Sequence, residues 1–429
     1  MNRLKSLALL LCLFITTQAM GQRIILHCGS LIDGNADALR TKVSVIIEGN
    51  KIVAVENGYT RADAGSGDQI INLRDKTVMP GLMDMHVHIE GQNSPARQLQ
   101  TYVLNPSDVA YDAQLYAQRT LMAGFTTVRD LGGSGVNVSL KKAINAGKVV
   151  GPRIYTAEKT IGTTGGHADP TNGAKVALMG DPGPAEGVVN SYDDSRKAVR
   201  QRYKNGADVI KITATGGVLS VAKDGQGPQF QMDELKGIVQ TAKEYGFVTA
   251  AHAHGDEGMR RAVEAGINSI EHGTFMSETT MDLMIEKGTY YVPTISAGKF
   301  VVEAAKIPGF FPAVVVPKAL EVGPQIQDTF AKAYARGVKI AFGTDAGVFP
   351  HGENGKEFGY MVEAGMKPME AIKSATIGAS QLLRIDDLFG TVAKGKMADI
   401  VAVDGNPLND ISVMERVSFV MKNGVVYKD

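Results

Sequence analysis

The sequence holds only two cysteines, Cys12 and Cys28, among its 429 residues. Cys12 lies in the N-terminal segment that we interpret below as a signal peptide, so a mature chain would retain Cys28 alone. Because one cysteine cannot form an internal disulfide, the fold must be stabilised by its hydrophobic core or by a bound metal. Cys28 follows a strand-like run, and we expect it to be a small buried hydrophobic residue.

An excess of either charge is also absent. Lys and Arg together number 45, and Asp and Glu together number 45. Removing residues 1–21 would remove Arg3 and Lys5 but no acidic residue. A protein without a charge excess offers no general attraction to nucleic acid or to an anionic membrane surface. We therefore expect neither nucleic acid nor a membrane as a partner.

The sequence lacks an apolar run long enough to cross a membrane, which takes about 20 residues. Its apolar run at 7–15 follows Arg3 and Lys5 and precedes small residues that end at Gly21. A basic start, a short apolar stretch and small residues at a cleavage site are typical of a secretory signal. We predict that residues 1–21 form a signal peptide and that the protein is exported, to the periplasm or out of the cell.

Short strand-like runs gather at the two ends of the chain. Turn signals such as Asp33-Gly34 and Asn423-Gly424 separate them. The runs are 24–26, 42–47, 51–55 and 69–72 near the N-terminus, and 400–403, 417–421 and 425–427 near the C-terminus. We predict a small β-sandwich assembled from both termini, from residues 22–80 and 386–429.

Strand-like and helix-like runs alternate through the middle of the chain. The strand candidates are 125–128, 153–157, 209–213, 248–251, 269–271, 290–294 and 339–343, and helical runs include 195–205, 232–245, 258–265 and 280–287. With the strand that carries His86 this makes eight strands, the number in a (β/α)8 barrel. We predict a TIM barrel over residues 81–385, with the glycine-rich stretch 162–187 as a loop over its mouth.

Two histidines, His86 and His88, end an apolar run that enters through Pro80-Gly81. On a β-strand the side chains of residues i and i+2 point to the same face, so both rings can reach one metal ion. A lone pair of this kind is often structural or exposed. The apolar flank buries both rings, which favours the metal interpretation.

Lys211 lies inside an apolar strand candidate at 209–213. A buried lysine is unfavourable unless it is paired or chemically altered. One interpretation is a salt bridge to a carboxylate inside the barrel. The other, which we favour, is a lysine with a depressed pKa that takes up carbon dioxide as a carbamate, an anion able to bridge two metal ions.

Further ligand-type residues follow at the ends of later strands. They are His252 and His254, His272, and Asp345. In a TIM barrel the carboxyl ends of the strands meet at one face, which is where catalytic groups lie. Neutral imidazole and carboxylate suit zinc, and they are also compatible with manganese, cobalt or nickel. Either His252 or His254 fits the required face.

These motifs together resemble the amidohydrolase superfamily in its form with two metal ions, within which the branch of Xaa-Pro dipeptidases and ochratoxin amidases is the most similar. The matching residues are the run from Pro80 to His88, Lys211, His252, His272, Gly343-Thr344-Asp345, and the C-terminal run from Gly390 to Val401. The resemblance implies two divalent metal ions, for which this donor set favours zinc. It assigns His86, His88 and Asp345 to one ion, His252 and His272 to the other, and carboxylated Lys211 to both.

The resemblance also implies roles in the reaction. Asp345 would take a proton from the attacking hydroxide and return it to the leaving nitrogen. His254 and His167 are the candidates for substrate contacts, and Lys223, Tyr290 and Tyr291 are weaker candidates for binding a substrate carboxylate. We expect Arg129 and Asp130 to form ion pairs at the barrel end, and the loops at 216–231 and 294–317 to set specificity.

The leading functional hypothesis is an amidase or peptidase that releases a C-terminal amino acid from dipeptides or N-acyl amino acids. The alternative is a cyclic-amide hydrolase of the hydantoinase or dihydroorotase type. An imidazolone- or deaminase-type enzyme is disfavoured because such relatives usually work with one metal and lack the strand lysine. A non-catalytic scaffold is disfavoured because all six ligand positions are present. We expect a small amide or peptide as substrate and a homo-oligomeric assembly.

Overall fold

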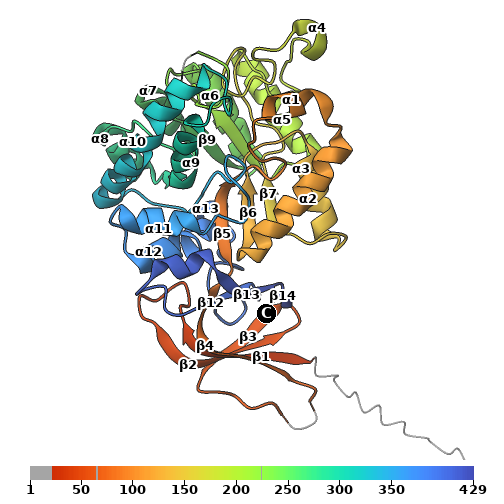
Figure 1. Ribbon diagram of the computed structural model, residues 1–429, viewed down its shortest axis with the longest axis vertical. Coiled ribbons are helices and arrows are strands. Elements are labelled where there is room, and N and C mark those ends of the chain that lie inside the picture. Colours follow the sequence, from red (N-terminus) through yellow and green to blue (C-terminus); the bar gives the residue numbers. More distant parts are fainter. Residues whose placement is uncertain (1–21, 64–65, 224) are drawn as a thin grey trace, which may run out of the picture.

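The structure, a computed structural model, describes residues 22–63, 66–223 and 225–429. The predicted signal peptide, residues 1–21, lies outside the described residues. Figure 1 shows a sheet at one end of the molecule, where N-terminal strands and C-terminal strands lie together, and a larger helix-rich body next to it. Among the described residues, no helix combines the length and the apolar character needed to cross a membrane.

The sheet at the chain ends contains strands from both termini, as predicted. Its order is β14-β13-β12-β4-β1-β2-β3. The strands are β1 (Arg23–Leu31), β2 (Arg40–Glu48), β3 (Lys51–Asn57), β4 (Gln69–Pro80), β12 (Ile400–Asp404), β13 (Val417–Lys422) and β14 (Val425–Lys428). The long strand β4 pairs with β1 in parallel and with β12 in antiparallel orientation, so it joins the two halves.

Hydrogen bonding is continuous across this sheet, from β14 to β3. Side chains from both halves, among them Leu26 and Phe419, form one buried cluster. Cys28 belongs to this cluster, is free and is fully buried, as predicted. Where β1 steps from Cys28 to Ser30, the partner in β4 changes from Leu73 to Thr77, so β4 carries a bulge there. Such a bulge bends the bulged strand and helps the sheet to curve over its own core.

The body has the TIM-barrel architecture, and its parallel strands fall in two groups. One sheet contains β5 (Leu82–Val87), β6 (Phe125–Asp130) and β7 (Arg153–Thr156), and the other contains β8 (Val209–Thr213), β9 (Val248–Ala253), β10 (Ser269–His272) and β11 (Tyr290–Val292). Regular strand pairing does not close the barrel. Between β7 and β8 the groups are linked through Ile161, which forms an isolated bridge with Ile212.

The eighth predicted strand, at 339–343, is not a regular strand, and in this detail the prediction is wrong. Backbone hydrogen bonds to both neighbouring strands hold the segment in place. Met85 N donates to the Phe342 carbonyl at 2.9 Å, and Ala341 N donates to the Tyr291 carbonyl at 3.0 Å. The backbone then turns at Asp345, whose φ of 62° is left-handed, so a strand ladder cannot continue.

Helices surround the barrel and precede or follow its strands. They are α1 (Arg97–Val103), α2 (Pro106–Met122), α3 (Val136–Asn145), α4 (Val176–Met179), α5 (Tyr192–Asn205), α6 (Met232–Glu244), α7 (Asp256–Ala265), α8 (Glu278–Lys287), α9 (Ile295–Ala305), α10 (Val315–Arg336), α11 (Lys356–Glu363), α12 (Pro368–Ser374) and α13 (Ile377–Leu383), with a 3-10 helix at Ile411–Glu415. The four predicted helical runs are confirmed as α5 to α8. Local signals explain them: Ser191 caps α5, and left-handed Gly206 ends it.

Helix α9 corrects the expectation of a loop at 294–317. Its first residues are stabilised by a side chain from another helix, because the buried carboxylate of Glu357 in α11 accepts hydrogen bonds from Ile295 N at 2.8 Å and Ser296 N at 2.7 Å. Two otherwise unpaired N–H groups of the first helical turn are satisfied in this way. Nothing near Thr294 in the sequence predicts this partner.

Gly343 is the residue that lets the irregular eighth segment fit between its neighbours. A Cβ at this position would lie 2.3 Å from Val292 Cγ1 and 3.1 Å from the backbone N of His86. We expect Gly343→Ala to lower the free energy of unfolding by about 1–3 kcal/mol, because overpacking forces backbone shifts. Urea unfolding measures this change. The control is Gly359→Ala in α11, where a Cβ meets nothing within 4 Å; this change should be neutral or stabilising by up to about 1 kcal/mol. Equal stability of both variants would contradict the packing argument.

Candidate active site

The carboxyl ends of the barrel strands surround one cavity of about 360 Å³. This volume lies in the range of small-molecule sites, which is about 300–1,000 Å³. All of the predicted site residues line it: His86, His88, His167, Lys211, His252, His254, His272 and Asp345. Residues up to 259 positions apart therefore meet at one place, because parallel strands of a barrel end at a common face.

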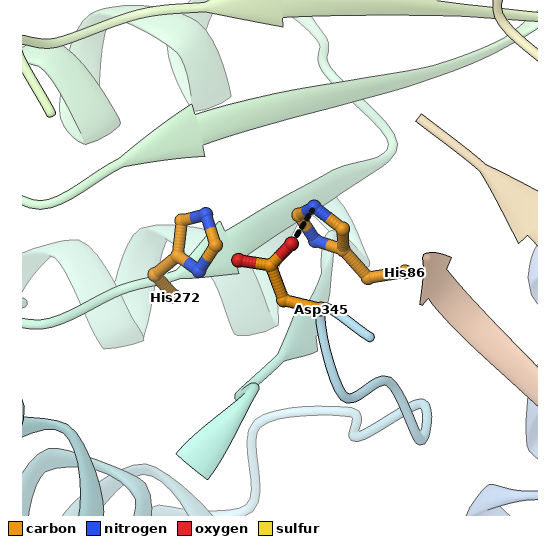
Figure 2. Close-up of side chains that lie close together, drawn as sticks. All are labelled: His86, His272 and Asp345. Atoms are coloured by element: carbon orange, nitrogen blue, oxygen red, sulfur yellow. Dashed lines mark ion pairs between the residues drawn. The ribbon is translucent and has the colours of Figure 1, made fainter. Parts of the chain in front are cut away.

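His86, His272 and Asp345 lie closest to the geometry of a metal site. One ligand atom from each lies within 4.8 Å of the others, and all three residues are buried. Figure 2 shows the Asp345 carboxylate between the two imidazole rings. Asp345 Oδ1 is 3.5 Å from His86 Nε2 and 3.5 Å from His88 Nε2. This buried oxygen makes no hydrogen bond with any described residue. Such an unsatisfied atom between imidazole nitrogens fits a site for a cation.

Each of five cavity histidines is fixed through one ring nitrogen, which leaves the other for the cavity. The pairs are His86 Nδ1 with Glu271 (3.0 Å), His88 Nδ1 with the Gly132 carbonyl (2.8 Å), His252 Nε2 with the Gly216 carbonyl (3.1 Å), His254 Nδ1 with the Thr274 hydroxyl (2.8 Å) and His272 Nδ1 with the Thr294 hydroxyl (2.7 Å). A metal-binding histidine usually has such a partner, which sets the tautomer and the ring orientation. The donor set therefore fits a divalent metal of the zinc type.

Burial keeps these histidines neutral. It lowers the pKa of His88 to about 4 and the pKa of His167 and His254 to about 3. Burial also lowers the pKa of His86, His252 and His272 well below the ordinary value. The neutral ring is the form that binds a metal ion, so the cavity holds its histidines ready for ligation near pH 7.

Lys211 lies at the cavity floor, with Nζ 3.4 Å from His86 Nε2. Among the described residues, no carboxylate lies within ion-pair distance of Nζ, so the salt bridge that we considered for this lysine is not formed. Burial lowers the pKa of Lys211 to about 8. A substantial fraction of neutral amine near pH 8 is what carbamate formation requires. Both observations favour the carbamate interpretation.

The backbone at the barrel mouth is strained at two residues that line the cavity, His272 and Asp345, and at Thr294, whose hydroxyl contacts the His272 ring. His272, Thr294 and Asp345 have left-handed φ values of 70°, 55° and 62°. Such values are unfavourable for residues other than glycine and occur where the surrounding structure imposes them, often at functional sites. The turn at His272 directs its side chain inward. As a result, Glu271 and His272 both face the barrel interior although they are neighbours in the chain.

Glu271 is the main supporting residue that the sequence does not reveal. It is fully buried, contacts His86 at 3.0 Å and forms an ion pair with Arg129 at 2.8 Å. Ordinary strand alternation would have placed Glu271 on the side away from His272. The expected ion pair of Arg129 is therefore present, and its partner is Glu271. Asp130 has no cationic partner among the described residues; it accepts hydrogen bonds from Asn137 and Thr156.

The three residues considered for a substrate carboxylate do not line the cavity. Tyr291 is fully buried, and its hydroxyl donates a hydrogen bond to the His272 carbonyl at 2.8 Å, so it supports the end of β10. Tyr290 lies at the start of β11, at the far end of the strand from the cavity, and Lys223 is exposed. Arg97 lines the cavity instead, together with His167, which packs with its ring centroid 4.4 Å from that of His252.

Lys318 in α10 holds the loop that borders His167. Its Nζ donates to the backbone carbonyls of Gly217 at 2.9 Å, Ser220 at 2.7 Å and Ala222 at 2.9 Å. The His167 ring lies against Gly217, where an added Cβ would come within 2.3 Å of the ring. A buried cation thus orders a loop that would otherwise leave its carbonyls unpaired.

Two threonines allow a matched test of the histidine roles. We expect Thr294→Val to lower metal affinity about 10–100-fold, because it removes the partner of His272 Nδ1. Thr274→Val removes the equivalent partner of His254, a residue predicted to contact substrate, and should lower turnover while metal content stays normal. Competition with a chromophoric chelator measures metal affinity in both. If Thr274→Val lost metal and Thr294→Val did not, the two histidine roles would have to be exchanged.

Comparison with known proteins identifies the family. Residues 77–427 match the amidohydrolase family. Ochratoxinase from Aspergillus niger is 32% identical over 431 residues, covering 94% of this chain and 86% of that protein. Among solved structures, a Xaa-Pro dipeptidase with bound methionine in the active site is 55% identical, with a TM-score of 0.92, covering 95% of this chain and 100% of that chain. A prolidase complexed with N-methylphosphonate-L-proline is 32% identical, with a TM-score of 0.85, covering 95% of this chain and 100% of that chain. The predicted family and branch are confirmed: this chain belongs to the amidohydrolase family and is a hydrolytic enzyme that acts on amide bonds.

Proposed function

We propose that this enzyme is a metal-dependent hydrolase that cleaves the amide bond of a C-terminal amino acid, in dipeptides or N-acyl amino acids. The observation that carries the proposal is the meeting of the six ligand-type side chains around one small cavity. The similarity to a Xaa-Pro dipeptidase that holds methionine in its active site supports an amino acid as the product.

The residues fit two divalent cations, for which we propose zinc. His86, His88 and Asp345 would hold one ion, and His252 and His272 the other. Lys211, carboxylated by carbon dioxide, would contribute to both. When bound, such ions supply a hydroxide nucleophile near neutral pH and polarise the carbonyl of the substrate.

The protein side chains carry the proton and steady the substrate. Asp345 accepts a proton at its carboxylate from the nucleophile and returns it to the leaving nitrogen, which completes C–N cleavage. The free Nε2 of His254 donates a hydrogen bond to the oxygen on which charge develops. His167, at the edge of the cavity, contacts the substrate from the loop side. Because His254 and Asp345 are buried, their interactions occur away from bulk water, where they are stronger.

A substrate panel tests this function. The purified enzyme is loaded with zinc in the presence of bicarbonate and assayed with Xaa-Pro and other dipeptides, N-acyl amino acids, hydantoins and dihydroorotate. We expect release of a free amino acid from the linear amides and loss of this activity after treatment with a chelator. Turnover of the cyclic amides alone would instead establish the alternative, a cyclic-amide hydrolase. Full activity in metal-free protein would contradict the metal-dependent proposal.

Export, domain limits and assembly are three further properties for which we make proposals. We propose that residues 1–21 direct export and are removed, which N-terminal sequencing of the protein recovered from the periplasm or medium would test. We propose domain limits at 22–80 with 386–429 for the sheet domain and 81–385 for the barrel. We also propose a homo-oligomer, which light scattering would test.

A further inference from the structure

The cavity has two chemically different walls beyond the proposed metal ligands. Apart from Lys211 and Asp345, Arg97 is the one charged side chain among the described residues that line it. The other wall is apolar and consists of residues from α9, from α10 and from the loop after β8. These are Ala297, Val301, Val322, Ile326, Val218 and Leu219. A substrate that fills this space must present a group for a cation as well as an apolar surface.

Arg97 is free to bind an anion. Among the described residues, no carboxylate lies within ion-pair distance of its guanidinium, and its side chain donates no hydrogen bond to any of them. Its position is defined by Gly91, where an added Cβ would lie 2.3 Å from Nη1 and 2.8 Å from Cζ. The guanidinium therefore lies directly over the Gly91 backbone, in the segment that follows His88. A guanidinium offers two parallel N–H groups that match a carboxylate.

The apolar wall is formed where two helices come close together. A Cβ on Gly298 of α9 would lie 3.2 Å from the Gly323 carbonyl of α10, and a Cβ on Gly323 would lie 2.6 Å from the Gly298 carbonyl. This close approach brings Val301 and Val322 to one surface of the cavity. Small-molecule sites typically combine such an apolar surface with a few polar groups that fix orientation.

We propose that Arg97 binds the free carboxylate of the leaving amino acid, and that the wall of α9 and α10 accepts an apolar part of the substrate. This inference rests on the proposed function and names its substrate class: amides whose leaving group is an α-amino acid with a free carboxylate and which carry an apolar side chain or acyl group. In the reaction the C–N bond breaks, the oxygen of water joins the acyl carbon, and a proton joins the leaving nitrogen. The carboxylate itself is unchanged, so Arg97 acts by binding.

A pair of substrates that differ only in this carboxylate tests the proposal. N-acetyl-L-leucine and N-acetyl-L-leucinamide are compared with the zinc-loaded wild type, with Arg97→Gln and with Arg97→Lys. We expect Arg97→Gln to raise KM for the carboxylate substrate about ten-fold or more with little change in kcat, since a hydrogen bond to a charged group is lost equally from the ground and transition states. Values for the amide should not change, and Arg97→Lys should be intermediate. Calorimetric binding of L-leucine gives a readout that is independent of turnover.

The control is Arg200→Gln, which removes the same charge from an exposed position on α5 and does not line the cavity. It should leave both substrates unaffected. If Arg97→Gln and Arg200→Gln gave the same KM for both substrates as the wild type, Arg97 would have no role in carboxylate binding and the inference would be overturned. If no linear amide were turned over by the wild type, the proposed function would fail, whereas weaker leucine binding by Arg97→Gln would still support the carboxylate site.

Discussion

Lys211→Ala is expected to lose both bound metal and turnover. The proposed carbamate would be the ligand shared by two cations, so its removal affects both at once. We expect activity to fall by more than the roughly 10–100-fold loss that follows from removing a residue that only supports a ligand. The measurement is metal content by mass spectrometry after dialysis, together with kcat/KM for the best substrate of the panel.

The controls for Lys211→Ala separate chemistry from folding. Lys197→Ala removes an exposed lysine of α5 and should retain full metal content and activity. Circular dichroism shows whether Lys211→Ala remains folded. Adding a short carboxylic acid such as acetate places a carboxylate in the space left by the lysine and should restore part of the metal content. A Lys211→Ala protein with normal metal and normal turnover would contradict the bridged-metal proposal.

Asp345→Asn is expected to keep metal but to react far more slowly. The amide oxygen of asparagine can still face a cation, whereas it cannot accept and return a proton. General acid and base groups contribute about 10²–10⁴-fold to rates, so a loss of kcat in this range is expected. Metal content and kcat are measured on the same preparation, so that the two roles of the side chain are distinguished.

The matched control is Asp328→Asn, an exposed carboxylate on α10 that does not line the cavity. It should behave as the wild type. If Asp345→Asn lost metal in proportion to its activity, Asp345 would act as a ligand alone and another group would have to move the proton. If it retained wild-type kcat, neither role would apply to Asp345.

The sequence alone determined the fold class and the ligand-type residues that line the cavity. Residues such as His86, Lys211 and His272 were identified because strand-like runs, their order and their carboxyl ends are local properties. In a barrel of parallel strands these ends must meet at one face, so residues far apart in the chain could be placed together without knowing any distance. The composite sheet followed in the same way from strand-like runs at both termini.

Only the tertiary structure decided how these residues are supported and what else faces the cavity. Glu271 and His272 both face the barrel interior because the backbone turns at His272, and α9 forms because Glu357 satisfies its first N–H groups from another helix. Arg97 lines the cavity, with its guanidinium against Gly91. These features depend on contacts between distant residues and on strained backbone angles. Such contacts and such angles arise from packing in three dimensions, so a pattern of residue types along the chain does not reveal them.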